Sequence, residues 1–215
     1  MKVEALLFDL GKVIIDFDLR PMLGILCQNS HRPAAEFETV FRNVDLLRSY
    51  ETGRITTAQF HEHLCSKGGL QMDFPAFRKI WSDVFMPEIL VSEALLKELK
   101  RRYPMILVSN TNEAHIGFIA ERYGVLEHFH HKVYSFEVGS MKPDPEIFQC
   151  AIALSGRNPE RLFFTDDREE NILAARELGM QAHQFESEAG LISALNDAGI
   201  ELGDVIQGDS LLRRS

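Results

Sequence analysis

The sequence contains no long hydrophobic segment. None of its apolar runs approaches the roughly 18–20 residues that a helix needs to cross a bilayer. The chain enters an apolar run at once, without the basic region, apolar region and small-residue cleavage site of a secretory leader. We therefore expect a cytoplasmic protein that does not associate with membranes.

Basic residues are also scarce relative to acidic ones. The 23 lysines and arginines face 32 aspartates and glutamates, which gives a net charge of -9. General affinity for nucleic acid needs a basic face, and no stretch here interleaves basic with aromatic residues. We expect no nucleic acid partner, and an anionic substrate would have to be held by local donors and a cation.

Cysteine is nearly absent. Cys27, Cys65 and Cys150 are odd in number and far apart, which argues against a disulfide framework or a zinc site and predicts reduced, buried thiols. The other bulk properties are ordinary for a soluble globular protein, with 45% hydrophobic and 26% charged residues. A chain of 215 residues can bury a full core, as one domain or as one domain with an insertion.

The chain begins with an apolar run that ends in a carboxylate. Residues 5–8 precede Asp9, and Gly11 follows two positions later. A short apolar run before a turn signal predicts a buried strand, although periodicity alone also allows a buried helix. In open α/β sheets, ligands bind at the carboxyl edge of the strands. Residues 13–15 then form a second short apolar run, which Asp16 and Asp18 break, and this pattern predicts a tight loop or flap.

Residues from about 20 to 85 show helical periodicity without a convincing strand. Pro33 and Glu36 suit the start of one helix, because proline and acids are favoured in a first turn. Thr56 is typical of an N-cap before another helix. Residues 73–85 place apolar side chains close to one stripe and predict a third helix. We interpret Trp81 and its aromatic neighbours as packing of this helical segment.

The second half alternates strands with helices. Strands are expected at 105–108, 132–136, 161–165 and 181–185, and helices at 95–102, 112–123, 145–154, 170–178 and 191–198. This alternation predicts a parallel sheet with right-handed crossovers. We predict an α/β fold with a Rossmann-like three-layer core, residues 1–16 and 90–215, and an all-helical cap of residues 17–89 inserted after the first strand.

Polar groups of defined chemistry follow three of these strands, at Asp9, Ser109-Asn110 and Asp166-Asp167, and Lys142 lies in a loop before a helix. Parallel strands share one carboxyl edge, so these groups should converge. A carboxylate can attack phosphorus, a hydroxyl and a lysine can bind the phosphoryl group, and paired aspartates suit magnesium. Each group alone has a simpler interpretation as a turn, loop or helix cap, but their combination in this order is far more specific.

These segments resemble the four motifs of the haloacid dehalogenase-like hydrolase superfamily. The matching segments are Phe8-Asp9-Leu10-Gly11, Val108-Ser109-Asn110, Lys142-Pro143 and Phe164-Thr165-Asp166-Asp167 through Asn171. The resemblance covers nearly the whole chain, and the helical segment lies where that superfamily carries its type-one cap. Residues 51–56 resemble a phrase common in such caps. Residues 142–148, with Phe129, Ser135 and Gly139, resemble small bacterial phosphatases, including sugar-phosphate phosphatases.

The resemblance implies phosphoryl transfer in two steps. Asp9 would attack phosphorus and form an aspartyl-phosphate. Ser109 and the backbone around Asn110 would hold the phosphoryl oxygens, and Lys142 would balance the charge of Asp9 and the phosphate. The implied partner is a small phosphorylated metabolite such as a sugar phosphate, and we expect a monomer or a weak homodimer.

The same resemblance implies a magnesium cofactor. Asp9, Asp167 and the backbone carbonyl of Gly11 would be ligands, with Asp166 binding directly or supporting the site. Asn171 occupies a position often filled by an acid that orients metal-bound water.

Gly11 departs from the pattern. Most phosphatases of the superfamily carry an aspartate there, which protonates the leaving oxygen and then activates water, help that typically contributes about 10²–10⁴-fold. The enzyme could favour leaving groups that need little protonation, a cap residue such as His61 or His63 could replace the acid, or the protein could be a weak or retired enzyme. Lys12 adds a cation beside the nucleophile, or is a solvated flap residue.

Other classes of protein fit less well. A metal-independent 2-haloacid dehalogenase also lacks the second aspartate, but it does not need Asp166-Asp167. A signalling receiver domain has its paired acids on the first strand, and a non-catalytic phosphate-binding module would keep the pocket without turnover. We interpret His128, His130 and His131 as surface and loop residues. We therefore predict a magnesium-dependent phosphatase.

Overall fold

A parallel sheet forms the centre of the computed structural model, which describes residues 2–203. The sheet has five strands in the order β5-β4-β1-β6-β7, and every neighbouring pair is parallel. The first strand is buried on both faces, as a central parallel strand must be, which accounts for its uninterrupted apolar sequence. The strands are β1 (Ala5–Phe8), β4 (Met105–Ser109), β5 (His131–Tyr134), β6 (Leu162–Asp166) and β7 (Gln181–Gln184).

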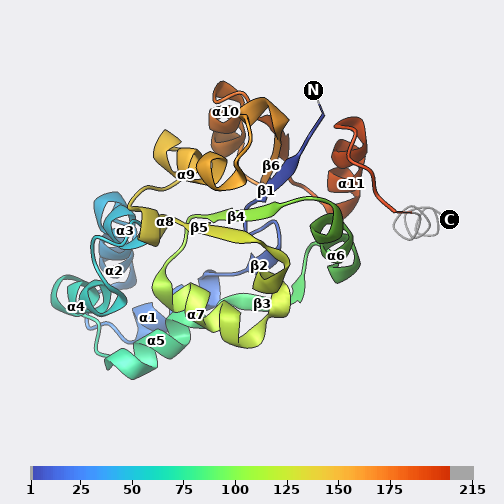
Figure 1. The fold of residues 1–215 in the computed structure, drawn as a ribbon. Coiled ribbons are helices and arrows are strands. Elements are labelled where there is room, and N and C mark those ends of the chain that lie inside the picture. The colour runs from blue at the N-terminus through green and yellow to red at the C-terminus, as the bar shows by residue number, and fades with distance from the viewer. Residues whose placement is uncertain (1, 204–215) are drawn as a thin grey trace.

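Helices cover both faces of the sheet and complete three layers (Figure 1). Leu6 and Phe8 point to one face and Ala5 and Leu7 to the other, because successive strand residues alternate. The first face packs against α6 (Glu93–Arg102), α7 (Glu113–Arg122) and α11 (Glu188–Asp197), and the second against α9 (Pro145–Ser155) and α10 (Glu169–Glu177). The predicted Rossmann-like three-layer core is confirmed.

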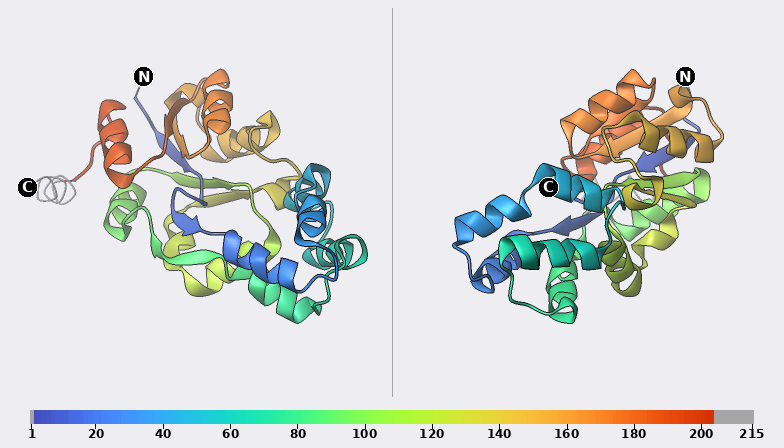
Figure 2. Two further views of the ribbon diagram at one scale, coloured as in Figure 1. Left: turned by 180° about the vertical axis from the view of Figure 1, so that it is seen from behind. Right: turned by 90° about the vertical axis from the view of Figure 1, so that its left-hand side faces the viewer.

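The helical insertion follows the first strand and packs around a core of its own. Figure 2 shows its helices as a separate layer beside the sheet. Tyr50, Phe60 and Trp81 are buried in this core, and the rings of Tyr50 and Phe60 stack with centroids 4.6 Å apart. Trp81 is therefore a packing residue, as expected. The helices are α1 (Arg20–Gln28), α2 (Ala34–Phe41), α3 (Val44–Glu51), α4 (Thr57–Gly68) and α5 (Phe74–Ser82).

Capping residues set the helix boundaries in this insertion. The hydroxyl of Thr56 accepts from the backbone of Gln59, and the Gln59 side chain accepts from the Thr56 backbone in return, a reciprocal capping box. Asp73 accepts from the backbone of Ala76 at the start of α5. Pro33 precedes α2 with φ of -53°. These local signals explain why the helix starts could be predicted from the sequence.

The prediction of helix through residue 85 is wrong at its end. The fifth helix stops at Ser82, and β3 (Phe85–Ile89) pairs antiparallel with β2 (Ile15–Phe17). Phe17 pairs with Phe85 across this ribbon. The two strands lie at opposite ends of the insertion. Their pairing is therefore a long-range contact, which a local sequence pattern does not predict.

The strand expected at 132–136 ends early, at Tyr134, and α8 (Ser135–Val138) follows as a single turn. The Ser135 hydroxyl accepts from the Thr111 backbone N–H at 2.9 Å and donates to the Thr111 carbonyl at 3.1 Å. This contact with the segment after β4 draws the chain away from the sheet edge. The short 3-10 turns are η1 (Gly124–His128) and η2 (Pro159–Arg161).

Two expectations about side-chain exposure are also corrected. All three cysteines are free, but Cys150 is exposed on α9 and Cys27 and Cys65 are only partly buried. His128, the last residue of η1, is buried rather than on the surface, whereas His130 and His131 are exposed. Across residues 2–203, no helix has the length and apolar character that a membrane span requires.

Candidate active site

The carboxyl edge of the sheet gathers the polar residues that follow β1, β4 and β6. Asp9 extends β1 by one residue, and its backbone N–H donates to the Thr165 carbonyl at 2.9 Å. Asp166 is the last residue of β6, and Ser109 the last of β4. All three side chains are buried. The sheet thus places residues more than 50 positions apart in the sequence at one point.

Lys142 joins these strands through its ammonium group. The Nζ atom lies 2.8 Å from Asp9 Oδ1 and 2.6 Å from Asp166 Oδ2, and it donates to the Val108 carbonyl at 2.7 Å. The side chain is 1% exposed, so a charged amine is fully enclosed by acceptors. A buried ammonium is tolerated only when its three donors are satisfied, as they are here.

Asn110 fixes the loop that carries Lys142. Its amide group donates to the Lys142 carbonyl at 2.8 Å, and its side-chain oxygen accepts from the Lys142 backbone N–H at 2.7 Å. The side chain of Asn110 therefore positions the loop of Lys142.

The charges at this edge do not balance. Burial raises the pKa of Asp9, Lys142 opposes that shift, and the carboxylate of Asp166 adds to it. Burial would lower the pKa of Lys142, but the attraction of Asp166 and Asp9 outweighs it and the net shift is upward. Burial and then the charge of Asp166 raise the pKa of Asp167. The cluster holds more negative charge than one lysine neutralises.

Asp9, Asp166 and Asp167 each offer an oxygen, and these three oxygens lie within 4.8 Å of one another. Carboxylate oxygens are the ligands that Mg²⁺ prefers, and a divalent cation would compensate the excess negative charge. The donor set therefore fits magnesium. The three aspartates are as close together as the sequence predicts.

Asp166 is the most heavily hydrogen-bonded of these carboxylates. Besides Lys142, it accepts from the Arg168 backbone and from the Asn171 amide group, both at 2.9 Å and both on Oδ1. Asn171 is buried beside it, and the Asn171 side-chain oxygen has no hydrogen-bond partner in the described structure. Asp167 is only partly buried and is the more accessible of the paired acids.

The flap after β1 closes one side of the cluster. A Cβ atom at Gly11 would lie 2.8 Å from Cε1 of Phe17, so an aromatic ring occupies the space where a side chain at position 11 would project. Lys12 forms an ion pair with Asp16 and donates to the Phe17 carbonyl at 2.7 Å. Lys12 and Asp16 therefore stabilise the flap and do not join the aspartates.

Phe17 is a site residue that the sequence did not reveal, because nothing in the local pattern distinguishes it from other flap residues. Val108 is another, since it contributes through its carbonyl group and any residue type has one. Ser135 carries a weak signal only through the resemblance to small bacterial phosphatases. Its hydroxyl holds the backbone of Thr111, directly after Ser109-Asn110.

The cap histidines do not reach the cluster. The Nε2 atom of His61 lies 2.9 Å from the Met72 carbonyl, and the ring packs against Phe74 and Phe77 within the cap. His63 lies two residues further along α4. Within residues 2–203, neither ring forms a hydrogen bond or an ion pair with the aspartates. The hydrogen bond and ring contacts of His61 are thus made within the cap.

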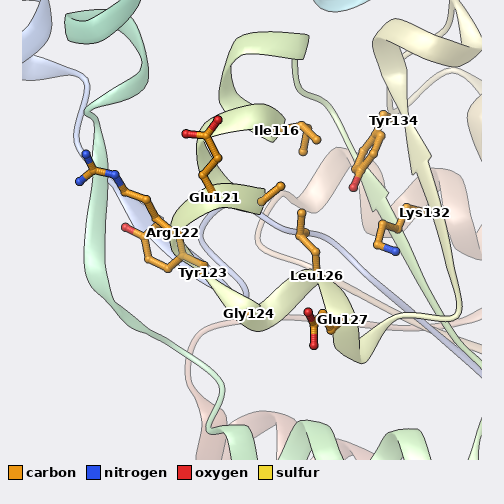
Figure 3. Close-up of a pocket in the computed structure, with 10 residues that line it drawn as sticks. Ile116, Glu121, Arg122, Tyr123, Gly124, Leu126, Glu127, Lys132 and Tyr134 are labelled. Carbon is orange, nitrogen blue, oxygen red and sulfur yellow. The ribbon is translucent and has the colours of Figure 1, made fainter.

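A cavity of about 590 Å³ lies elsewhere, between α7, η1 and β5 (Figure 3). Ile116 and Glu121 line it from α7, and Lys132 and Tyr134 line it from β5. None of its lining residues belongs to the aspartate cluster. This cavity is therefore separate from the site that the strand-end residues form.

Comparison with known proteins places the chain in a family. The profile described as haloacid dehalogenase-like hydrolase matches residues 3–179. The chain belongs to this family of hydrolases. The four motifs, the parallel sheet order and the helical insertion after the first strand all agree with that assignment.

Several relatives of this haloacid dehalogenase-like hydrolase resemble nearly all of it. A D-ribitol-5-phosphate phosphatase from Bacteroides thetaiotaomicron is 25% identical over 193 residues, which cover 87% of this chain and 94% of that protein. A family enzyme of the same organism, solved as wild type in complex with magnesium and inorganic phosphate, has a TM-score of 0.73 and 26% identity, covering 86% of this chain and 95% of that one.

A third relative supports the fold alone. The structure of a predicted HAD-like family hydrolase from Porphyromonas gingivalis has a TM-score of 0.77 at 24% identity and covers 94% of this chain and 100% of that one. The similarity therefore includes the helical insertion as well as the sheet.

Proposed function

We propose that this hydrolase is a magnesium-dependent phosphatase that acts on a small phosphorylated metabolite, such as a sugar or polyol phosphate. One observation carries the proposal. Lys142 bridges Asp9 and Asp166 at the carboxyl edge of the sheet, and the oxygens of Asp9, Asp166 and Asp167 lie within 4.8 Å of one another. This set suits phosphoryl transfer.

Asp9 is the nucleophile in this proposal. Its carboxylate attacks phosphorus, the bond from phosphorus to the leaving oxygen breaks, and water then hydrolyses the aspartyl-phosphate. The ammonium of Lys142, 2.8 Å from Asp9 Oδ1, favours the ionised carboxylate against the effect of burial and neutralises the incoming phosphate. Ser109 and the backbone N–H groups around Asn110 hold the phosphoryl oxygens.

In this proposal the magnesium ion would be held by Asp9, Asp167 and the carbonyl of Gly11. Asp166 would support the site through Lys142 or contribute its remaining lone pairs. When bound, the ion would supply charge neutralisation between the carboxylates and the phosphate. The side-chain oxygen of Asn171, which is buried beside Asp166 and has no hydrogen-bond partner among the described residues, would be free to orient a water molecule.

The paired acids favour this function over a metal-independent 2-haloacid dehalogenase. A dehalogenase would gain nothing from a second and third carboxylate beside its nucleophile, and their charge would repel a haloacid anion. The relatives that cover most of the chain include a phosphatase and a complex with magnesium and phosphate. These similarities support phosphate as the group that the site binds.

The division into domains remains part of the proposal. Residues 1–16 and 90–215 form the core that carries the chemistry, and residues 17–89 form the cap that selects the substrate. The β2–β3 ribbon connects the two and lies against Gly11 through Phe17. We expect a monomer or a weak homodimer.

Hydrolysis of p-nitrophenyl phosphate with and without magnesium tests the function. We expect turnover that requires magnesium, that EDTA abolishes, and that Asp9→Asn abolishes without loss of fold. Turnover by Asp9→Asn would refute the nucleophile, and magnesium-independent release of halide from a 2-haloacid would favour the dehalogenase. Binding of phosphate without turnover would indicate a non-catalytic module. A panel of sugar and polyol phosphates, including D-ribitol 5-phosphate, then defines the substrate.

A further inference from the structure

The proposed phosphatase reaction needs a proton for its leaving group, and the flap cannot provide one. The ring of Phe17 fills the position beside Gly11 where the family carries an acid, and this ring packs edge-on against Phe85. The flap acids are engaged elsewhere, because Asp16 pairs with Lys12 and Asp18 with Arg20. A donor must therefore come from another side of the site.

The end of α3 in the cap lies against the core at the carboxyl edge. α3 packs on α8, and Figure 1 shows the two side by side. In the turn after α3, Gly53 has a φ of +68°, and a Cβ there would lie 2.2 Å from the Phe136 carbonyl oxygen. Only glycine fits this contact. The turn at Gly53 therefore packs directly against the backbone of Phe136, in the segment that leads to Lys142.

Side-chain contacts anchor both flanks of this turn. Arg48 forms an ion pair with Asp144, two residues beyond Lys142. The Tyr50 hydroxyl donates to Thr57 Oγ1 at 2.9 Å, which in turn donates to Glu113 Oε1 of the core helix α7 at 2.9 Å. These contacts hold the end of α3 and the start of α4 against the core.

That last residue is Glu51, a partly buried acid. Its carboxyl group makes no hydrogen bond or ion pair to any residue that the structure describes, whereas Asp144 and Glu113 are both engaged. Burial raises the pKa of Glu51, opposed by the charge of Arg168, the residue directly after Asp167. Tyr50 is the titratable group beside it on its own helix. Glu51 thus ends a helix that packs on α8, the segment leading to Lys142, and its carboxyl group senses the charge of Arg168 from the loop of the paired acids.

We propose that Glu51 is the catalytic acid of this enzyme and donates the proton to the leaving-group oxygen. As the Asp9 carboxylate bonds to phosphorus, the bond from phosphorus to the substrate oxygen breaks, and the Glu51 carboxyl proton moves to that oxygen to give a neutral alcohol. Glu51 is left as a carboxylate. It recovers its proton from the water that attacks the aspartyl-phosphate, which releases inorganic phosphate and the Asp9 carboxylate.

This assignment explains how a glycine can stand at position 11. The acid comes from the cap instead of the flap, so that it is in place only when the cap lies on the core. The inference rests on the proposed phosphatase function, and the two fail in different ways in the following experiment.

The test compares two leaving groups in the Glu51→Gln variant, which keeps the size of the side chain but carries no acidic proton. Phenyl phosphate releases a phenol with a pKa of about 10, as for tyrosine, whereas p-nitrophenyl phosphate releases a weakly basic phenolate that needs little protonation. We expect kcat/KM for phenyl phosphate to fall by roughly 10² or more and that for p-nitrophenyl phosphate to stay within a few-fold. The value of kcat/KM compares free enzyme and substrate with the transition state. It therefore depends on departure of the leaving group but not on the later hydrolysis of the aspartyl-phosphate.

Glu62→Gln, at an exposed position on α4, is the matched control and should change neither value. Equal losses for both substrates would assign Glu51 to binding or structure and overturn the proposal, as would an unchanged value for phenyl phosphate. Glu51→Asp should restore part of the loss with phenyl phosphate. If the wild-type enzyme hydrolyses neither substrate with magnesium, the phosphatase function itself is refuted, and the catalytic acid with it.

Discussion

At the scale of single residues, the site depends on one buried cation. Lys142 is enclosed by Asp9, Asp166 and the Val108 carbonyl, so its removal would leave two buried carboxylates without a positive partner. Breaking a buried ion pair costs more than the pair contributes in net stability, because the remaining charge is still desolvated.

Lys142→Met should therefore destabilise the protein by about 3–5 kcal/mol and abolish hydrolysis. Urea denaturation in EDTA measures the free energy of unfolding without metal. Lys97→Met is the control, because this exposed lysine pairs with Glu93 on the surface and should contribute less than about 1 kcal/mol. Equal effects for the two variants would contradict a buried, charged Lys142.

Asp167 provides a second prediction at this scale. It is partly buried, so that Asp167→Asn should fold normally. The loss of one carboxylate charge should raise the magnesium concentration required for half-maximal activity by about tenfold or more. A titration of activity with magnesium checks this, and an unchanged requirement would remove Asp167 from the proposed ligands.

At the scale of elements, the β2 strand decides what can stand at position 11. A side chain on Gly11 would meet the Phe17 ring at 2.8 Å, and an inserted side chain in a packed site typically costs about 1–3 kcal/mol.

Gly11→Asp should accordingly destabilise the protein and lower its activity, although it restores the residue common in the family. Combining it with Phe17→Ala should relieve the clash, so that the double variant is more stable than the sum of the two single changes predicts. A double-mutant cycle of unfolding free energies measures this coupling. Additive effects would show that Phe17 moves aside without cost.

His115 joins the cap helix α5 to the core helix α7. Its Nε2–H donates to the Trp81 carbonyl at 3.0 Å, and its Nδ1 accepts from the Asn112 amide at 3.0 Å. Burial lowers the pKa of His115 to about 4, against the opposing effect of the bond to Trp81. The joint between cap and core therefore needs a neutral imidazole.

Stability should depend on pH through this residue. The unfolded chain binds a proton at His115 below a pKa of about 6.5, whereas the folded protein resists it until about pH 4, so stability falls as the pH drops between these values. The loss should approach about 2–3 kcal/mol near pH 4. Urea denaturation at pH 7 and pH 4.5 should show a smaller decrease for His115→Gln than for the wild type. Identical decreases would contradict the lowered pKa.

At the scale of the whole molecule, the aspartate cluster forms only when the core strands and the loop of Lys142 are in place. A ligand that binds this assembled site must stabilise the entire fold, because the unfolded chain cannot present the three aspartates together.

Saturating magnesium should therefore raise the melting temperature. At a concentration of about 100 times the Kd, the stabilisation is about 2.7 kcal/mol, which corresponds to roughly 5–10 °C for a protein of this size. Thermal unfolding followed with and without magnesium measures the shift, and calcium serves as a comparison ion. The shift should shrink in Asp167→Asn, and its absence in the wild type would contradict a magnesium site.

The sequence by itself determined the parallel sheet, the insertion after the first strand and the strand-end residues of the site. These follow from local signals, since apolar runs, helix caps and the carboxyl-edge rule each depend on neighbouring residues. Residues Asp9, Ser109, Lys142 and Asp166-Asp167 could be named because the chemistry suits those residue types and their order resembles the four motifs of the family.

Only the tertiary structure decided the β2–β3 ribbon, the ring of Phe17 against Gly11, the clamp of Asn110 on the Lys142 backbone and the position of Glu51. Each of these depends on contacts between segments far apart in the chain, or on a backbone group that every residue carries. They therefore cannot be predicted from the residue types alone. The missing acid at Gly11 was visible in the sequence, but the side from which it can be replaced depends on where the cap meets the core.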